Sequence, residues 1–205
     1  DPPRAADLLL EGYARAVTDG LTAAAPFLEL GIAALRERDT GPDEVLRWGS
    51  AGAHAARALW DEEACRELAA RQVQLAREAG ALPALTIGLE VKIASRLHAG
   101  ELSEAESLLG ELDRITEATG VASSPCAAIA VAAWRGRDAE ARELAGPGGN
   151  GAIAALHNAA GRYEEAVAAA RRASVGLAVG GLHELVEAAA RSDESAEAAE
   201  ALEQL

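Results

Sequence analysis

Histidines and cysteines are the residues of this chain best suited to metal or redox chemistry, and they are scattered. The four histidines are His54, His98, His157 and His183. None has a second histidine four residues away, the spacing that places two imidazoles on one helical face, and no cysteine lies near them. Cys65 and Cys126 form no Cys-x-x-Cys pair, so both are expected to be reduced residues buried in helices. The sequence therefore predicts no metal ligands.

The sequence motifs also support neither phosphate binding nor acid–base catalysis. Residues 146–151 are rich in glycine but lack the Gly-Lys-Ser/Thr ending of a phosphate-binding loop. The carboxylate pairs Glu62-Glu63 and Glu164-Glu165 stand at predicted helix starts, where the helix dipole keeps them ionised. Ser123-Ser124 and Ser192 lack the Gly-x-Ser-x-Gly turn of a nucleophilic serine. We expect no catalytic or cofactor-binding residue in this chain, and no enzyme activity.

A few side chains are candidates for contacts with a ligand. Trp48, Trp60 and Trp134 fall on predicted first helices of helical hairpins, which line the concave side of helical repeat arrays. Packing in the core is favoured over ligand contact for all three. The candidates for contacts in a groove are Trp48, His54, Arg96, Trp134 and His157.

Composition indicates which elements carry these residues. Of the 205 residues, 50% are hydrophobic but only 3% aromatic, and alanine supplies much of the apolar total. Helix formers therefore dominate and strand formers are sparse, which predicts an all-α fold. No apolar run is long enough for a membrane span and no secretory segment opens the chain, so a cytoplasmic location is expected. The net charge of −14 disfavours direct binding of this chain to nucleic acid.

An internal repeat organises the chain. Segments 100–105, 136–141 and 161–166 all read Gly, three variable residues, Glu, Ala. Each glycine follows an apolar helical run, so each segment predicts a helix ended by glycine, a tight turn and a second helix. Weaker copies near 19–25, 61–64 and 193–198 bring the predicted hairpin turns to six.

The repeat spacing is uneven. The aligned alanines at positions 25, 64, 105, 141, 166 and 198 are separated by 39, 41, 36, 25 and 32 residues. A helical hairpin with its turns needs roughly 32 residues or more, so the fourth interval is short. Either a loop replaces part of a helix near 144–152, or residues of the natural chain are missing there, and again near 174–181. The absence of methionine favours the second reading.

Helical periodicity extends over almost the whole chain. The helices are predicted at 4–17, 21–38, 42–59, 61–79, 83–99, 103–119, 125–135, 138–144, 152–160, 163–173, 182–191 and 195–205. Paired helices that cannot bury their own apolar faces stack into an α-solenoid, here with tetratricopeptide-like repeats of about 36–40 residues. We expect one such domain over 1–205. Because an apolar stripe reaches the last residue, we expect this domain to be part of a longer chain.

The best-defined repeat carries a family resemblance. The run Leu-His-Asn-Ala-Ala-Gly-Arg-Tyr-Glu-Glu-Ala at 156–166, continued to 173 and followed by 182–192, resembles the helical region of large ATP-binding regulators of the LuxR type. Segments 71–82, 115–120 and 132–137 look similar to the same family in the same order. The resemblance covers nearly the whole chain, but its spacing departs from the family near 146 and 175.

This resemblance implies a bacterial transcriptional regulator. In that family a nucleotide-binding module precedes the helical repeats and a helix-turn-helix domain follows them, so ATP and DNA binding would belong to the full-length protein only. The repeats would receive a small-molecule inducer or a protein partner and pass the signal to homo-oligomerisation. The alternative is a free-standing tetratricopeptide-like adaptor that binds peptides or proteins in its groove.

Overall fold

A computed structural model describes residues 3–120, 123–145, 151–173, 181–192 and 194–203. These residues form twelve α-helices and no strand, which confirms the predicted all-α fold and each predicted helix to within a few residues at its ends. No helix in these ranges is long and apolar enough to cross a membrane. The helices are α1 (Ala5–Thr18), α2 (Leu21–Arg36), α3 (Pro42–Ala58), α4 (Glu62–Ala79), α5 (Leu82–His98), α6 (Leu102–Thr119), α7 (Cys126–Trp134), α8 (Asp138–Ala145), α9 (Gly151–Ala159), α10 (Tyr163–Ala173), α11 (Leu182–Arg191) and α12 (Ser195–Glu203).

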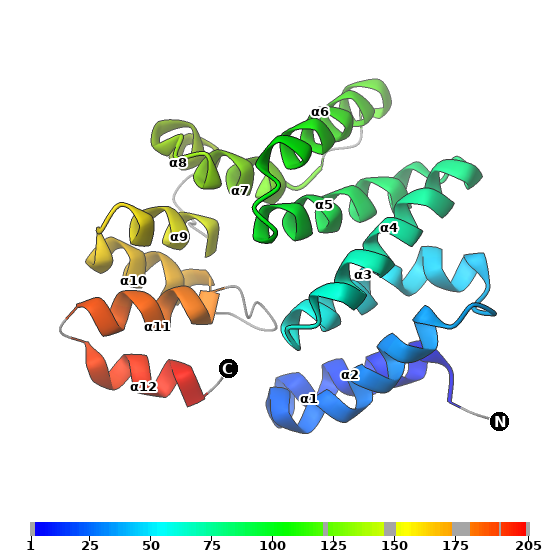
Figure 1. Ribbon diagram of the computed structural model, residues 1–205, viewed down its shortest axis with the longest axis horizontal. Helices are drawn as coiled ribbons and strands as arrows, with labels where there is room; N and C mark the ends of the chain where they lie inside the picture. Colours follow the sequence, from blue (N-terminus) through cyan, green and yellow to red (C-terminus); the bar gives the residue numbers. More distant parts are fainter. Residues whose placement is uncertain (1–2, 121–122, 146–150, 174–180, 193, 204–205) are drawn as a thin grey trace. The chain divides into compact units, whose positions relative to one another are not determined.

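The helices divide into two compact units, Asp1–Ser123 and Ser124–Leu205. The first unit holds α1 to α6, and Figure 1 shows them as successive antiparallel pairs. Each helix of this unit packs against the next, and α1, α3 and α5 also pack side by side. In the second unit α7, α9 and α11 pack together in the same way. The expectation of one continuous domain over 1–205 stays a prediction.

The hairpin turns follow one hydrogen-bonding scheme. Gly100, Gly136 and Gly161 have φ of 75°, 70° and 70°, the left-handed conformation that ends a helix and that glycine adopts without a Cβ clash. The next residue donates its N–H to a carbonyl five residues back, as Glu101 does to Arg96 at 2.8 Å. The backbone thus reverses within a few residues, and the second helix starts at once.

Two alignments in the sequence repeat were wrong by one residue. Ala105 donates its N–H to Glu101 O, and in the preceding hairpin the equivalent bond, from the N–H to Asp61 O, comes from Cys65 instead of Ala64. In the first hairpin the equivalent residue is Ala24, not Ala25. A small buried side chain at this position is what the repeat requires, because it faces the first helix of the hairpin.

Trp60 occupies the turn position that glycine holds elsewhere. It follows α3 with φ of 60°, so it lies in the turn and not on the first helix of a hairpin, as the sequence pattern had indicated. Its side chain is 59% exposed. A left-handed conformation costs a residue with a Cβ about 1 kcal/mol or more. The α3–α4 turn therefore carries backbone strain that the glycine turns avoid.

Glycines inside the helices set the spacing of the first hairpin. A Cβ on Gly12 would lie 2.4 Å from Leu28 Cδ2 and 3.2 Å from the Leu28 nitrogen. On the facing helix, a Cβ on Gly31 would lie 2.9 Å from Leu9 Cγ. Leu9 and Leu28 are fully buried, so each leucine of one helix fills the space opposite a glycine of the other. This reciprocal packing holds α1 tightly against α2.

The two cysteines differ in burial. Cys65 is buried, as expected, and burial raises the pKa of its thiol to about 11, with nearby Glu62 adding to the increase. Cys126 is exposed at the start of α7, so its expected burial was wrong. Cys126 follows the N-cap residue Pro125, so it lies in the first turn of the helix and outside the set of α7 residues that are buried.

Short helices fill the narrow repeat interval. Between Ala141 and Ala166 the described residues place the end of α8, which has 8 residues, and all of α9, which has 9. These lengths explain how a repeat of 25 residues still forms paired helices. Residues 146–150 and 174–180, on which the prediction of missing sequence falls, lie outside the described residues.

Candidate functional site

Within each unit, ion pairs tie the second helix of one hairpin to the second helix of the next. In the first unit, Arg36 of α2 binds Glu67 of α4 at 2.6 Å, and Arg77 of α4 binds Glu111 of α6 at 2.7 Å. Such a pair at the same place in successive hairpins cross-links neighbouring repeats. These guanidinium groups are therefore already used within the unit.

The same arrangement recurs in the second unit. Arg162, at the start of α10, pairs with Asp138 of α8, and Arg171 of α10 pairs with Glu194 and Glu197 at α12. The Arg162 guanidinium helps to hold the pKa of the Asp138 carboxyl below its ordinary value against the opposing effect of desolvation. Cross-hairpin pairing is thus a property of second helices in both units.

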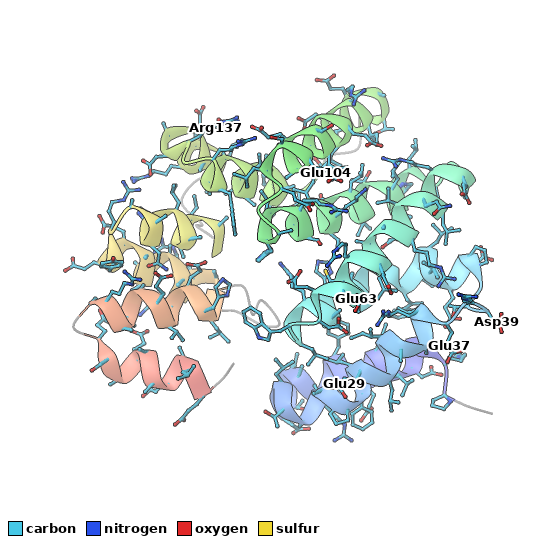
Figure 2. The ribbon with its side chains drawn as sticks, in the orientation of Figure 1. Glu29, Glu37, Asp39, Glu63, Glu104 and Arg137 are labelled. Carbon is cyan, nitrogen blue, oxygen red and sulfur yellow. The ribbon has the colours of Figure 1, made fainter. Side chains whose placement is uncertain are left out.

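Charge is distributed unequally between the two sets of helices in the first unit. The first helices α1, α3 and α5 carry five acidic and five basic residues. The second helices α2, α4 and α6 carry ten acidic and five basic residues. Figure 2 labels exposed carboxylates of this second group, among them Glu29, Glu63 and Glu104. The excess of negative charge thus lies on the second helices.

One face of α3 carries cations that pair with no carboxylate among the described residues. Arg47, Ser50, His54 and Arg57 recur at steps of three and four residues, which places them along one side of the helix. Arg47 and His54 are exposed, and Ser50 and Arg57 are half-buried. The opposite side of α3 is packed in the core. We refer to these four residues as the α3 cationic face.

The surroundings of His54 are positive. Desolvation by the surrounding protein lowers the pKa of the His54 imidazole, and the Arg57 charge lowers it further. A hydrogen bond to the backbone of Ser50 acts in the opposite direction but is weaker. No carboxylate contributes to this shift. The α3 cationic face is therefore positive around His54 and Arg57, whereas Asp43 and Glu44 lie within one turn of Arg47.

Tyr13 fixes α1 beside this face. Its hydroxyl donates to the Ala51 carbonyl of α3 at 2.6 Å, one residue from Ser50. Burial raises the pKa of the Tyr13 phenol to about 12, although the nearby Arg57 charge lowers it slightly. The phenol stays neutral and keeps its proton for this bond. Tyr13 therefore links two first helices without contributing a charge.

Large exposed apolar side chains also gather on first helices of this unit. Leu10 and Val17 of α1 are 54% and 72% exposed, and Leu82 and Ile87 of α5 are 42% and 47% exposed. Among the described residues of the second helices α2, α4 and α6, only Leu30 is comparable. Apolar side chains on both sides of a cationic helix are a common composition for a protein-binding surface.

Of the predicted groove residues in the first unit, only His54 belongs to the α3 cationic face. Trp48 lies on α3 but is half-buried and packs against the core. Arg96 of α5 pairs with Glu101 at 2.6 Å and Glu104 at 3.3 Å, so it holds α5 against the start of α6. Their use as groove contacts stays a prediction, and for Arg96 it would require these pairs to open.

The other two predicted residues belong to the second unit. Trp134 ends α7 and is 41% exposed. His157 of α9 is buried, and its Nδ1 accepts a hydrogen bond from Arg162 Nε at 3.0 Å. Desolvation lowers the pKa of this imidazole, and the Arg162 charge adds to the effect. His157 thus lies inside the network that joins the α8 and α10 helix starts.

Sequence inspection missed Arg47, Ser50 and Arg57. The spacing that could have found them was present, since they share the helical period of His54. What the sequence did not reveal is which arginines pair elsewhere, because Arg36 and Arg77 look equally available until their partners 31 and 34 residues away are known.

The α3 cationic face offers two guanidinium groups and a hydroxyl as binding groups. In the described part of the chain, no three His, Cys, Asp or Glu side chains gather in a way that could hold a metal ion. Comparison of the chain with protein-family models, with curated proteins and with solved structures gives no match. Its function must therefore be argued from the surface itself.

Proposed function

We propose that this chain is an interaction segment that receives a partner on its first helices. The observation that carries the proposal is the pair of arginines on one face of α3. Arg47 and Arg57 have no carboxylate partner in the described residues, whereas Arg36 and Arg77 bind carboxylates of the next hairpin. Exposed cations and exposed apolar side chains on the same set of helices provide both the charge and the area that recognition needs.

The packing supports an α-solenoid of tetratricopeptide-like repeats as the architecture. Successive helices pack in order, first helices pack on first helices, and α2 packs on α4. The corrected repeat positions Ala24, Cys65, Ala105 and Ala141 are 41, 40 and 36 residues apart, close to the repeat length expected from the sequence. Repeats of this kind present one set of helices as a continuous binding surface.

The resemblance to LuxR-type regulators supplies the proposed context. On this proposal the segment senses an inducer or protein partner in the bacterial cytoplasm and controls oligomerisation and DNA-bound activity of a full-length regulator. It performs no catalysis itself, and ATP would bind to another module. A free-standing adaptor is the second candidate, and the same first-helix surface would serve it.

The complete coding sequence separates these two candidates. A regulator requires a phosphate-binding loop upstream and a helix-turn-helix downstream of this segment. If both are present, the Arg47→Gln/Arg57→Gln variant of the full-length protein should lose induction of a transcriptional reporter. The matched Arg38→Gln/Arg66→Gln variant, which removes two exposed arginines outside the first helices, should retain it. Equal loss in both variants would contradict the assignment to first helices.

A further inference from the structure

The α3 cationic face is long enough to contact several residues of an extended peptide. From Arg47 to Arg57 the helix advances ten residues, or about 15 Å at 1.5 Å per residue. A single phosphate or carboxylate spans only a fraction of that distance. An extended peptide advances about 3.3 Å per residue, so four or five residues would cover the face.

The groups on the face are suited to carboxylates. Each arginine presents a planar guanidinium that binds a carboxylate through two parallel hydrogen bonds. The two arginines stand ten residues apart on α3, and the Ser50 hydroxyl between them can donate a further hydrogen bond, whereas the His54 N–H already bonds the Ser50 backbone. Two carboxylates several residues apart would satisfy both ends at once, which a small anion could not do.

The rest of the chain disfavours a nucleic acid as the ligand. The net charge of −14 repels a polyanion that carries one charge per roughly 1.7 Å. A short peptide with two or three carboxylates experiences far less of this repulsion, because charges beyond about 8 Å are screened at physiological salt. The apolar side chains of Leu10, Val17 and Ile87 on the flanking helices suit a peptide that also carries aliphatic residues.

From this geometry we infer that the α3 cationic face binds an acidic peptide segment of a partner protein, with Arg47 and Arg57 each holding one carboxylate. The inference rests on the proposed function and names the partner chemistry for the same surface. The peptide lies extended along α3, and its aliphatic side chains contact α1 or α5.

Fluorescence polarisation with short labelled peptides tests this inference on the whole 205-residue chain. The probe is an octapeptide that alternates Glu and Leu, and the comparison peptides replace every Glu by Gln or by Lys. We expect the acidic peptide alone to bind, with a Kd that increases with salt. Arg47→Gln/Arg57→Gln should weaken binding about tenfold. Arg38→Gln/Arg66→Gln, with the same change in charge, should change the Kd less than about twofold.

Three outcomes overturn the inference. One is equal binding of the Gln or Lys peptide, and another is equal weakening by the two double variants. The third is displacement of the peptide by inorganic phosphate at the peptide's own concentration, which would indicate a small-anion site. Failure of the proposed function is a different result: the transcriptional reporter would then respond equally in the two double variants, whichever peptide binds. Circular dichroism of each variant excludes unfolding as the cause of lost binding.

Discussion

Two arginines of second helices and two arginines of α3, all in the first unit, make different contacts. On second helices, Arg36 and Arg77 reach across to the next hairpin and bind Glu67 and Glu111. On α3, exposed Arg47 and half-buried Arg57 have no carboxylate partner in the described residues. Arg36 and Arg77 thus join neighbouring repeats, and Arg47 and Arg57 are available to a ligand.

This difference has a physical origin in the excess of carboxylates. Second helices carry ten acidic residues, and two of their arginines, Arg36 and Arg77, bind a carboxylate of the next hairpin. First helices carry five, and those of α3 stand in its first turn at Asp43 and Glu44, away from His54 and Arg57. Both lie within one turn of Arg47, so the part of α3 without carboxylates begins after Arg47.

The largest expected effect comes from separating α1 from α2, which would remove one side of the first-helix surface. Gly12→Val places methyl groups where even a Cβ would be 2.4 Å from Leu28 Cδ2. We expect a loss of about 3 kcal/mol in the free energy of unfolding, measured by urea titration. Gly110→Ala is the matched control, because a Cβ there meets nothing within 4 Å. A loss of less than about 1 kcal/mol for Gly12→Val would contradict the packing described here.

A smaller effect should come from the strained α3–α4 turn, where the cationic helix ends. Trp60→Gly relieves a left-handed φ of 60° and should stabilise the chain by about 1 kcal/mol. Gly100→Ala introduces the same strain in the next hairpin turn and should destabilise by a similar amount. Melting temperatures of the two variants should move in opposite directions. Movement in the same direction would show that Trp60 makes contacts worth more than its strain.

The packing of α4 against α3 and α5 contains a position where a substitution should increase the stability of the chain. Gln72 is 1% exposed and its Oε1 has no hydrogen-bond partner among the described residues. The side chain lies against Gly49 of α3 and Gly88 of α5. Gln72→Met keeps the volume and removes the unsatisfied oxygen, so we expect about 1 kcal/mol of stabilisation in chemical denaturation. Destabilisation would mean that this amide oxygen is hydrogen-bonded in solution.

Acidification tests the desolvation of the two shifted histidines and the effect of the arginines beside them. The pKa values of His54 and His157 are lower in the folded chain than the ordinary 6.5. The unfolded chain therefore binds more protons as pH falls below about 6.5, so the free energy of unfolding should decrease from pH 7 to pH 5. His54→Gln/His157→Gln should flatten this dependence. Imidazole titration midpoints above 6.5 by NMR would reverse the predicted sign.

The smallest change in the free energy of unfolding is expected for the ion pairs between second helices. Arg77→Gln removes an exposed pair with Glu111 and should cost less than about 1 kcal/mol, with the loss reduced further at high salt. A double-mutant cycle with Glu111→Gln isolates the coupling. Zero coupling would mean that these cross-hairpin pairs are features of the surface without effect on repeat cohesion.

The sequence was sufficient for the helices and insufficient for the site. Helical periodicity and the glycine turns predicted all twelve described helices, because both signals are local. The register at Cys65 was missed because Ala64 imitates the small residue of the repeat one position early. Trp60 was placed on a helix because nothing in a tryptophan indicates a left-handed turn.

The availability of each cation depends on tertiary contacts and could not be predicted. Arg96 was a candidate for a groove contact, but Glu101 and Glu104 at the start of α6 pair with it. His157 was another candidate, but the packing of α9 buries it and Arg162 donates to its Nδ1. Only after these partners are known do Arg47 and Arg57 stand out. The resemblance to LuxR-type regulators and the choice between a regulator and an adaptor stay predictions.

The most direct test of the account is chemical-shift mapping on isotopically labelled chain during titration with the acidic Glu-Leu octapeptide. We expect the largest amide shifts on Arg47 to Arg57 of α3, with smaller shifts on α1 and α5. Amides of α2, α4 and α6 should stay nearly unchanged. Shifts concentrated on second helices, or spread evenly over both sets, would contradict the claim that first helices form the binding surface.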